Sequence, residues 1–389
     1  MSERVSDVDR RAFLAMTGVA AVALPAVAGA HPGHRASDMI IVNTLGGLGN
    51  PNELPDGPDT GTGVDGTGRG GIEQRVIDDA RASGLTAVNV TLGYVAGDME
   101  PFEYSVREIG IWDARLRQRP HDLLKVLNAA DILRAKAENK IGIIYGFQNA
   151  AMMGDDASRA DIFADLGVRV IQLTYNPGNQ LGDGSMAPEN LGITPFGREV
   201  IERLNADRVI VDLSHSGERT CLEAAAHSRQ PISINHTGCR ALVDLPRNKT
   251  DEELRLVASK GGFVGIYFMP FLDPQSRATA DDVVAHIDHA VNVCGEDHVG
   301  IGTDGGTTGI DDMAAYRARI AKQIADRRAA GIGAIGENPD TVPFVLDLNG
   351  PTQFHKLADL LRQRGYTENR IEKIMGLNFI NYAREIWGA

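Results

Sequence analysis

The sequence predicts an α/β protein whose main domain is a TIM-like (β/α)₈ barrel. Three observations predict this fold. Short runs rich in β-branched residues alternate with longer amphipathic stretches along most of the 389 residues. Most of these runs are continuously apolar, as expected of strands in a parallel sheet that is covered by helices. Their number is about eight, the number that closes such a barrel. An open, doubly wound sheet is the structural alternative.

The strands are expected in the apolar runs Met39–Asn43, Leu85–Thr91, Ile141–Phe147, Val168–Thr174, Arg208–Leu213, Pro231–Asn235, Gly262–Phe268 and His298–Thr303. Amphipathic helices are expected between them, among others at Gly71–Ser83, Pro120–Asn139, Phe196–Asn205, Asp251–Lys260 and Ala280–Cys294. After the last strand, further helices are expected at Met313–Ala330, Gln353–Gln363 and Glu368–Trp387. Strands that alternate with helices in this way imply parallel pairing through right-handed crossovers.

The first thirty residues have the pattern of an export signal. Arg10 and Arg11 form a twin-arginine pair, and the apolar run that follows ends in the small residues Ala28-Gly29-Ala30. This pattern is typical of a Tat signal peptide, residues 1–30, which leaves residues 38–389 as a single barrel domain. An uncleaved membrane anchor is the alternative, although the run is short and weakly apolar for a span. We therefore expect a periplasmic or secreted protein with no stable membrane span after cleavage.

The charge balance excludes some classes of partner. The chain carries 39 Lys and Arg against 52 Asp and Glu, a formal net charge of −13. Nucleic acids and anionic lipids require clustered positive charge, so neither is an expected partner. The three cysteines, Cys221, Cys239 and Cys294, show no metal-binding spacing and are expected to be small buried side chains.

A glycine-rich stretch interrupts the barrel pattern between residues 50 and 71. It contains Gly61-Thr62-Gly63-Val64-Asp65-Gly66, which formally matches the dinucleotide-binding fingerprint. No strand leads directly into this match, and a single copy is a weak signal. A lid or rim over the mouth of the barrel is the better interpretation.

Polar side chains end nearly every expected strand. In a barrel of this type the active site lies at the carboxyl ends of the strands. The side chains found there are Asn43, Thr91, Gln148, Tyr175, His215, His236, Tyr267 and Asp304. Two imidazoles on adjacent strand ends can converge with a carboxylate from the last strand. This is the layout of a zinc site that keeps one coordination position open.

Five motifs resemble the membrane (renal) dipeptidase family, peptidase family M19 of the amidohydrolase superfamily. They are VDLSH, ending in His215; INHTGCRAL, with His236; RNKTDEEL, from Arg247; GIGTD, ending in Asp304; and the terminal IMGLNFINY. The resemblance covers the chain from about the third strand to the C-terminus. It implies a TIM-like barrel, hydrolysis of dipeptides and sometimes of β-lactams, two zinc ions bridged by a glutamate, and often a homodimer.

The resemblance also assigns roles to single residues. His215 and His236 match two histidines of one metal site, and Asp304 matches an aspartate that binds the other metal and serves the attacking water. Arg247 matches an arginine that holds the substrate's carboxylate, a task that suits the guanidinium fork. Tyr267 and Tyr175, which also end strands, are expected to line the same substrate pocket.

Three positions depart from the family's pattern. The first strand ends with Asn43, Thr44 and Gly46 in place of a His-x-Asp pair, and Gln148 replaces the bridging glutamate. Tyr175 replaces a histidine that steadies the oxyanion. Because two bridged cations would have too little negative charge around them, we expect one Zn²⁺ per chain.

In the site so predicted, His215, His236 and Gln148 hold the ion. Asp304, itself a metal ligand in the family, becomes the general base, and Tyr175 donates a hydrogen bond to the oxyanion. Each residue also has a structural interpretation. Gln148 or Tyr175 could be pocket wall, Asp304 could cap a turn, and Arg247 could form a surface ion pair.

Three functions follow from these residues. The first is a metal-dependent hydrolase that cleaves an amide C–N bond in a small dipeptide-like or N-acyl amino acid substrate. The second is a non-catalytic binding or regulatory protein on the same scaffold, and the third is a non-hydrolytic enzyme such as a lyase or an isomerase. Loss of the acidic ligands favours the second and third, whereas retention of His215, His236 and Asp304 favours a working hydrolytic site.

Overall fold

The computed structural model describes residues 39–53 and 71–388. The chain divides into a short N-terminal unit, Met1–His34, and a second unit, Arg35–Ala389. The predicted export signal, the glycine-rich motif at Gly61–Gly66 and most of the expected lid lie outside the described residues. The fold presented below is that of the second unit.

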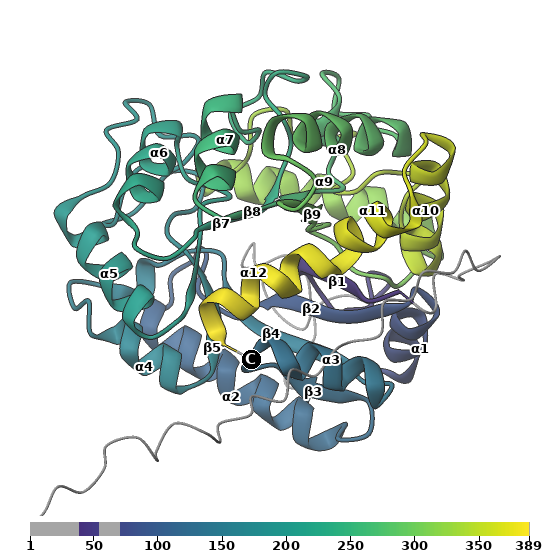
Figure 1. Ribbon diagram of the computed structural model, residues 1–389, viewed down its shortest axis with the longest axis horizontal. Coiled ribbons are helices and arrows are strands. Elements are labelled where there is room, and N and C mark those ends of the chain that lie inside the picture. The colour runs from purple at the N-terminus through teal and green to yellow at the C-terminus, as the bar shows by residue number, and fades with distance from the viewer. Residues whose placement is uncertain (1–38, 54–70, 389) are drawn as a thin grey trace, which may run out of the picture. The chain divides into compact units, whose positions relative to one another are not determined.

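Eight parallel strands follow one another around a barrel (Figure 1). They are β1 (Ile41–Gly46), β2 (Leu85–Thr91), β4 (Ile141–Phe147), β5 (Val168–Gln172), β6 (Ile210–Asp212), β7 (Ser233–Thr237), β8 (Phe263–Ile266) and β9 (Val299–Ile301). Each neighbouring pair is parallel. A ninth strand, β3 (Leu123–Lys125), pairs with β4 outside this path.

The barrel closes between its last and first strands. Gly46 and Gly305 form a parallel bridge, and the amide of Asp304 donates to the carbonyl of Leu45 at 2.9 Å. Inside the barrel, Thr44 Oγ1 donates to the carbonyl of Ile301 at 2.9 Å. These contacts confirm the predicted (β/α)₈ barrel and rule out the open sheet.

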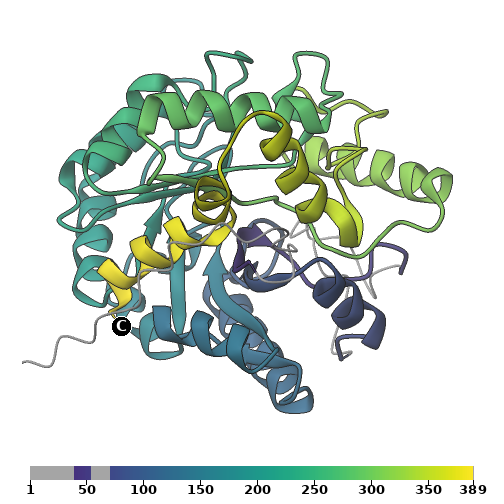
Figure 2. The ribbon, with the colours of Figure 1, turned by 45° about the vertical axis from the view of Figure 1, so that its right-hand side comes forward.

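A ring of helices surrounds the strands, as Figure 2 shows from an oblique angle. The ring and its extensions comprise α1 (Gln74–Ala82), α2 (Pro101–Gln118), α3 (Ala129–Ala137), α4 (Arg159–Asp165), α5 (Pro195–Ala206), α6 (Glu218–His227), α7 (Asp251–Ser259), α8 (Ala280–Cys294), α9 (Met313–Ala329), α10 (Gln353–Gln363), α11 (Glu368–Glu372) and α12 (Asn378–Trp387). Local sequence sets where many of them begin. Thr250 and Glu253, for example, form a capping box that satisfies the first free N–H groups of α7.

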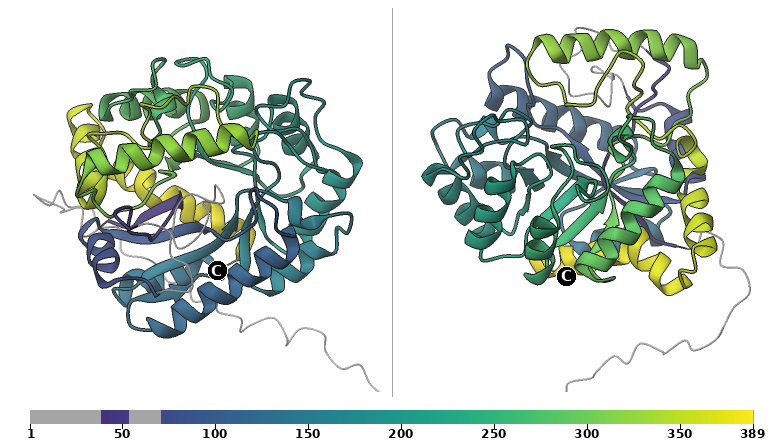
Figure 3. Two further views of the ribbon diagram at one scale, coloured as in Figure 1. Left: turned by 180° about the vertical axis from the view of Figure 1, so that it is seen from behind. Right: turned by 90° about the horizontal axis from the view of Figure 1, so that it is seen from above.

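The two ends of the barrel are covered differently. Helix α12 crosses the end at which the strands begin (Figure 1), whereas α9 lies at the opposite end (Figure 3). Apolar side chains of α12 pack against the lowest layer of the barrel interior; the strand residues of that cluster include Val42, Ile144, Val170, Ile210 and Phe263. The end at which the strands finish is therefore the one that can hold a site.

The next layer of the interior is polar. Thr44, Gln172 and Asp212 each lie two residues beyond an apolar residue of the lowest layer, so their side chains face the same way. All three are buried. Space there is tight, because a Cβ atom on Gly302 would lie 1.9 Å from the carbonyl oxygen of Asn235. The interior thus changes from apolar to polar toward the mouth.

Two predicted helices differ from the observed ones. The stretch from Pro120 to Asn139 contains β3 before α3, because Asn128 and Asp131 form a capping box that starts the helix only at Ala129. The stretch Glu368–Trp387 is interrupted by a π-helical turn, η5 (Lys373–Leu377), between α11 and α12. In the described parts of the chain, no helix has the length and apolar character that a membrane crossing requires.

Candidate active site at the barrel mouth

Two histidines lie together at the carboxyl ends of adjacent strands. His215 follows β6 and His236 belongs to β7; their side chains are buried, with 4% and 0% exposure. The two Nε2 atoms are 2.9 Å apart. The ring of Tyr175 stacks on that of His215 with a centroid separation of 4.2 Å. The convergence of the two imidazoles predicted from the sequence is thus present in the structure.

A buried carboxylate holds the ends of β6 and β7 together beneath the histidines. Asp212 Oδ1 accepts hydrogen bonds from Ser214 Oγ at 2.5 Å and from the amide of Asn235 at 3.0 Å. Ser214 Oγ in turn accepts from the amide of His236 at 3.0 Å. Burial raises the pKa of Asp212, and these hydrogen bonds oppose that effect. The chain of bonds fixes the backbone on which both imidazoles are mounted.

Both imidazoles are neutral at physiological pH. Burial, followed by the positive charge of Arg247, holds the pKa values of His215 and His236 well below the ordinary value. A neutral imidazole has one bare nitrogen and can serve as a metal ligand or as a base. His236 Nδ1 is buried without a hydrogen-bond partner in the described structure.

An asparagine contacts the other side of the His215 ring. Asn176 follows Tyr175 beyond the end of β5, and its side chain is 3% exposed. Its Oδ1 lies 2.7 Å from His215 Nδ1, and its Nδ2 donates to the carbonyl of Ile332 at 2.8 Å. The amide thus connects the histidine pair to the segment that follows α9.

A buried arginine lies near the histidines without a carboxylate hydrogen-bonded to it. Arg247 is 3% exposed, and its guanidinium donates to the carbonyl of Ser214. It also lies 5.9 Å from the centroid of the Tyr267 ring, which follows the neighbouring strand β8. Among the described residues no ion pair neutralises it, unlike most of the arginines on the surface. The alternative interpretation of Arg247, a surface ion pair, is therefore excluded by its burial.

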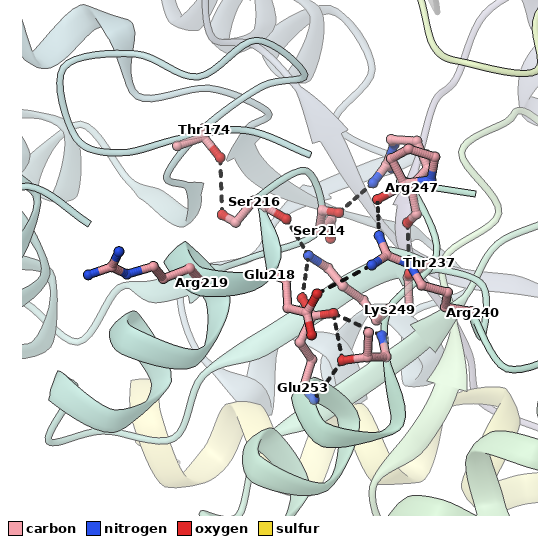
Figure 4. A network of polar contacts seen from close by, with 12 residues as sticks. Thr174, Ser214, Ser216, Glu218, Arg219, Thr237, Arg240, Arg247, Lys249 and Glu253 are labelled. Atoms are coloured by element: carbon pink, nitrogen blue, oxygen red, sulfur yellow. Dashed lines mark hydrogen bonds and ion pairs between the residues drawn. The ribbon is translucent and has the colours of Figure 1, made fainter. Parts of the chain in front are cut away.

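A buried ion pair supports the loop that carries this arginine (Figure 4). Lys249 Nζ lies 3.1 Å from Glu253 Oε1, and the two side chains are only 2% and 1% exposed. Lys249 also donates to the carbonyl of Ser216, next to His215. Because removing one partner would leave a buried charge uncompensated, we expect this pair to hold the loop in one conformation.

The charge of Asp304 acts on both Tyr175 and Tyr267 at the mouth of the barrel. Asp304 has a positive φ of 60°, a backbone conformation that costs a non-glycine residue about 1–3 kcal/mol and is typical of functional sites. Burial raises its pKa to about 6, and Arg247 and Arg327 oppose the shift. Burial, together with the charge of Asp304, raises the pKa of Tyr175 to about 12. The phenol therefore stays protonated at neutral pH.

The tyrosine at the end of β8 is already engaged. Tyr267 is fully buried, and its hydroxyl donates to Asn248 Oδ1 at 2.5 Å. It therefore offers a ring face toward Arg247, and its hydroxyl is occupied by the protein. That the Tyr267 ring lines the substrate pocket stays a prediction.

Two strand-end amides at positions that depart from the family's pattern are held by the barrel itself. Asn43 Nδ2 donates to Thr303 Oγ1, and its Oδ1 accepts from the Thr303 amide, both at 2.8 Å. Gln148 Nε2 donates to Thr91 Oγ1 at 2.7 Å. Asn43 thus joins β1 to the end of β9, which is a structural role. The Nε2 group of Gln148 is already hydrogen-bonded to Thr91.

These donors do not fit a bridged pair of metal ions. In the described parts of the chain, no three His, Cys, Asp or Glu side chains are grouped so that they could share an ion. The predicted set in which Asp304 joins both histidines is therefore not assembled. Added to the effect of burial, the charge of Asp304 instead raises the pKa values of Tyr175 and Tyr267.

A single ion fits the two histidines. Two nitrogens bound to one tetrahedral zinc at about 2.0–2.1 Å would be roughly 3.3 Å apart. The observed 2.9 Å requires only a small separation of the rings. Both imidazoles are neutral, and their Nε2 atoms face each other. His215 and His236 are therefore the residues that would hold one metal ion.

Sequence reasoning missed three features of this region. They are Asn176, the Lys249–Glu253 pair and His286, which is only 1% exposed. Asn176 could have been found by its position directly after a strand-end residue. The burial of His286 and the bond from Lys249 to the carbonyl of Ser216 could not, because these contacts join segments distant in sequence.

The fold and the site define a class: a (β/α)₈-barrel protein with a histidine pair and a carboxylate at the mouth, the architecture of metal-dependent hydrolases. The model of the membrane dipeptidases, peptidase family M19, matches residues 98–331. The chain therefore belongs to the membrane dipeptidase family.

Individual relatives agree with this assignment. A dipeptidase of Claviceps purpurea, tcpJ, is 30% identical over 263 residues, which are 66% of this chain and 54% of that protein. An uncharacterized protein in the pqqA 5′ region of Klebsiella pneumoniae is 29% identical over 61% of this chain and 91% of its own length. The crystal structure of an amidohydrolase from Pseudomonas aeruginosa is 29% identical, with a TM-score of 0.75 over 91% of this chain and 98% of its own. The chain thus spans about half the length of the first of these relatives.

Proposed function

We propose that this protein hydrolyses the amide C–N bond of a small dipeptide-like or N-acyl amino acid substrate with the help of one divalent metal ion, Zn²⁺. The observation that carries the proposal is the facing of the His215 and His236 Nε2 atoms at 2.9 Å, at the carboxyl ends of adjacent barrel strands. Membership of a dipeptidase family supports the same reaction.

Each residue of the mouth has a task in this reaction. His215 and His236 would hold the ion, which would supply a Lewis acid and lower the pKa of a nearby water toward about 7. Arg247 binds the carboxylate of the substrate, because a buried guanidinium that forms no ion pair with any described residue favours an anionic ligand. Asp304, with its pKa of about 6, is mostly ionised at pH 7 and accepts a proton. Tyr175 stays protonated and donates to the developing oxyanion.

The test combines metal content with hydrolysis. Protein purified without added metal is analysed for elements and assayed on a panel of dipeptides and N-acetyl amino acids, before and after chelation. We expect about one zinc per chain and an activity that chelation removes and zinc restores. His215→Ala should lose both metal and activity. The matched control is His289→Ala, whose ring pairs with Asp251 on the outer helices and should keep both. Hydrolysis that persists unchanged in His215→Ala would overturn the proposal.

A second function, a non-hydrolytic family member that binds a small carboxylate, is favoured by one observation. Gln148 stands where the family resemblance places the bridging glutamate, and its amide is bonded within the barrel. Saturable binding of N-acyl amino acids that depends on Arg247, without turnover of any substrate in the panel, would establish this alternative.

We also propose that the protein is exported through the twin-arginine route to the periplasm. The support is the Arg10-Arg11 pair, the apolar run and the Ala28-Gly29-Ala30 pattern. N-terminal sequencing of protein recovered from the periplasm checks this, with His31 as the expected first residue. Recovery of the uncut chain in the cytoplasm would contradict it.

A further inference from the structure

The hydrogen bonds around Asn176 determine which nitrogen of His215 carries a proton. The carbonyl of Ile332 can only accept a hydrogen bond, so the group 2.8 Å from it must be the amide NH₂ of Asn176. The amide oxygen therefore faces His215 Nδ1 at 2.7 Å. Because that oxygen can only accept, His215 Nδ1 must carry the hydrogen. His215 Nε2 is then bare and points at His236.

The same reasoning extends to the second ring. With His215 Nε2 bare, a hydrogen bond across the 2.9 Å gap requires His236 Nε2 to be the donor. A neutral His236 that donates through Nε2 has a bare Nδ1. That nitrogen is the atom found buried without a donor opposite it. Both rings are thus consistent with one arrangement of protons that begins at a backbone carbonyl.

We propose that Asn176 is a positioning residue that locks His215 in the Nδ1–H form and thereby prepares its Nε2 as a metal ligand. Two contacts fix the positions of the Asn176 amide and the His215 ring. The carbonyl of Ile332, in the segment after α9, accepts a hydrogen bond from the Asn176 amide. The Tyr175 ring stacks on the His215 ring with a centroid separation of 4.2 Å. Asn176 itself is 3% exposed, so water does not compete for these bonds.

The arrangement also predicts that metal would bind weakly. A metal ion held by both histidines would displace the hydrogen on His236 Nε2, which would then have to move to Nδ1. Among the described residues, that nitrogen has no acceptor nearby, and an unpaired buried donor costs about 1–3 kcal/mol. His215 is prepared for the metal and His236 is not. This part of the inference rests on the proposed metal-dependent function, whereas the form of the His215 ring does not.

The test reads the ring directly in metal-free protein. Nitrogen-15 labelling of the ten histidines and NMR detection of the ring nitrogens distinguish Nδ1–H from Nε2–H, and His215→Gln assigns the signal. In the wild type we expect His215 to be the Nδ1–H form. Asn176→Ala should shift it toward Nε2–H, and Asn176→Asp, which keeps an acceptor, should restore Nδ1–H.

A control residue lies in the same loop. Asn179 makes partly buried amide bonds to Asn149 and to the carbonyl of Leu173, and no bond to His215 is among them. Asn179→Ala should therefore disturb the loop and leave the His215 signal unchanged. An Nε2–H form of His215 in the wild type, or an unchanged form in a folded Asn176→Ala, would overturn the proposal.

Zinc titration of the same proteins separates this inference from the proposed function. Loss of an outer partner of a ligand typically weakens metal binding roughly 10- to 100-fold. We expect that loss in Asn176→Ala but not in Asn176→Asp or Asn179→Ala. If the wild type binds no zinc while its His215 is locked as Nδ1–H, the metal-dependent function fails and the positioning role stands. If zinc binds equally to all four proteins, the positioning role fails and the metal-dependent function stands.

Discussion

Arg247 is a fixed positive charge held almost entirely out of water at the mouth of the barrel. Its guanidinium donates to the carbonyl of Ser214, which leaves part of the fork free for a ligand. Loss of a hydrogen bond to a charged group costs about 1.5–3 kcal/mol. We predict that Arg247→Gln raises KM for a substrate carboxylate about 10- to 100-fold, with a smaller effect on kcat. Steady-state kinetics on a cleaved substrate measure both constants.

Two further variants distinguish binding from packing. Arg247→Lys keeps the charge but loses the planar fork, so its KM should fall between those of the wild type and Arg247→Gln. Arg240, on the same loop, pairs with Glu218 at 3.4 Å, and Arg240→Gln should leave KM unchanged. Equal increases of KM in all three variants would indicate a general disturbance of the loop.

His286 links three elements on the outside of the barrel. From α8, its Nδ1 accepts from the amide of Cys239, beyond β7, at 2.9 Å, and its Nε2 donates to the carbonyl of Leu272 in η3 (Pro270–Leu272) at 3.1 Å. Burial lowers its pKa to about 4, and Asp282 and His289 on the same helix act on it in opposite directions. A proton on Nδ1 would break the bond to Cys239, so the ring must stay neutral.

The sign of its pH effect follows from linkage. The ordinary pKa of 6.5 in the unfolded chain lies above the folded value of about 4. The unfolded chain therefore binds the extra proton first, and stability falls as the pH drops below 6.5 until about 4. Between pH 7.5 and pH 5 this residue should reduce the free energy of unfolding by about 2 kcal/mol.

Urea unfolding at the two pH values measures this effect by difference. His286→Gln removes the titrating ring but keeps a donor and an acceptor, while every other group titrates as before. The loss of stability on acidification should be about 2 kcal/mol smaller in His286→Gln than in the wild type. An identical loss in the two proteins would mean that His286 does not remain neutral in the folded state.

At the scale of the whole molecule, the sequence predicted the barrel but only part of its site. Hydrophobic runs such as Leu85–Thr91 and Ile141–Phe147 matched observed strands residue by residue, because burial of parallel strands leaves a strong local signal. His215 and His236 met as predicted, because neighbouring strands end at one edge. Asp304 did not join them, since the path of the loop after β9, with its positive φ, depends on contacts that no local pattern encodes.

The remaining differences have the same origin. The partners of Asn176 and Lys249 come from segments distant in sequence, and a single sequence does not reveal which distant groups will meet. Gln148 and Asn43 could be recognised as departures from the family's pattern. Their hydrogen bonds to Thr91 and Thr303 could be seen only in the folded structure.

The separation between the two ends of the barrel gives a final prediction. Phe379 of α12 is 1% exposed and packs edge to face on Phe263 and Trp387, with centroid separations of 5.3 and 5.8 Å, at the end opposite the histidine pair. Phe379→Ala should lower the free energy of unfolding by about 3–5 kcal/mol, since a buried ring leaves a cavity. Leu133→Ala, at an exposed leucine of α3, should cost far less. Because α12 contacts the lowest interior layer and the polar layer lies between that layer and the mouth, zinc affinity and the form of His215 should not change in folded Phe379→Ala. A shift in either readout at temperatures where the variant is fully folded would show that the apolar end of the barrel sets the geometry of the mouth.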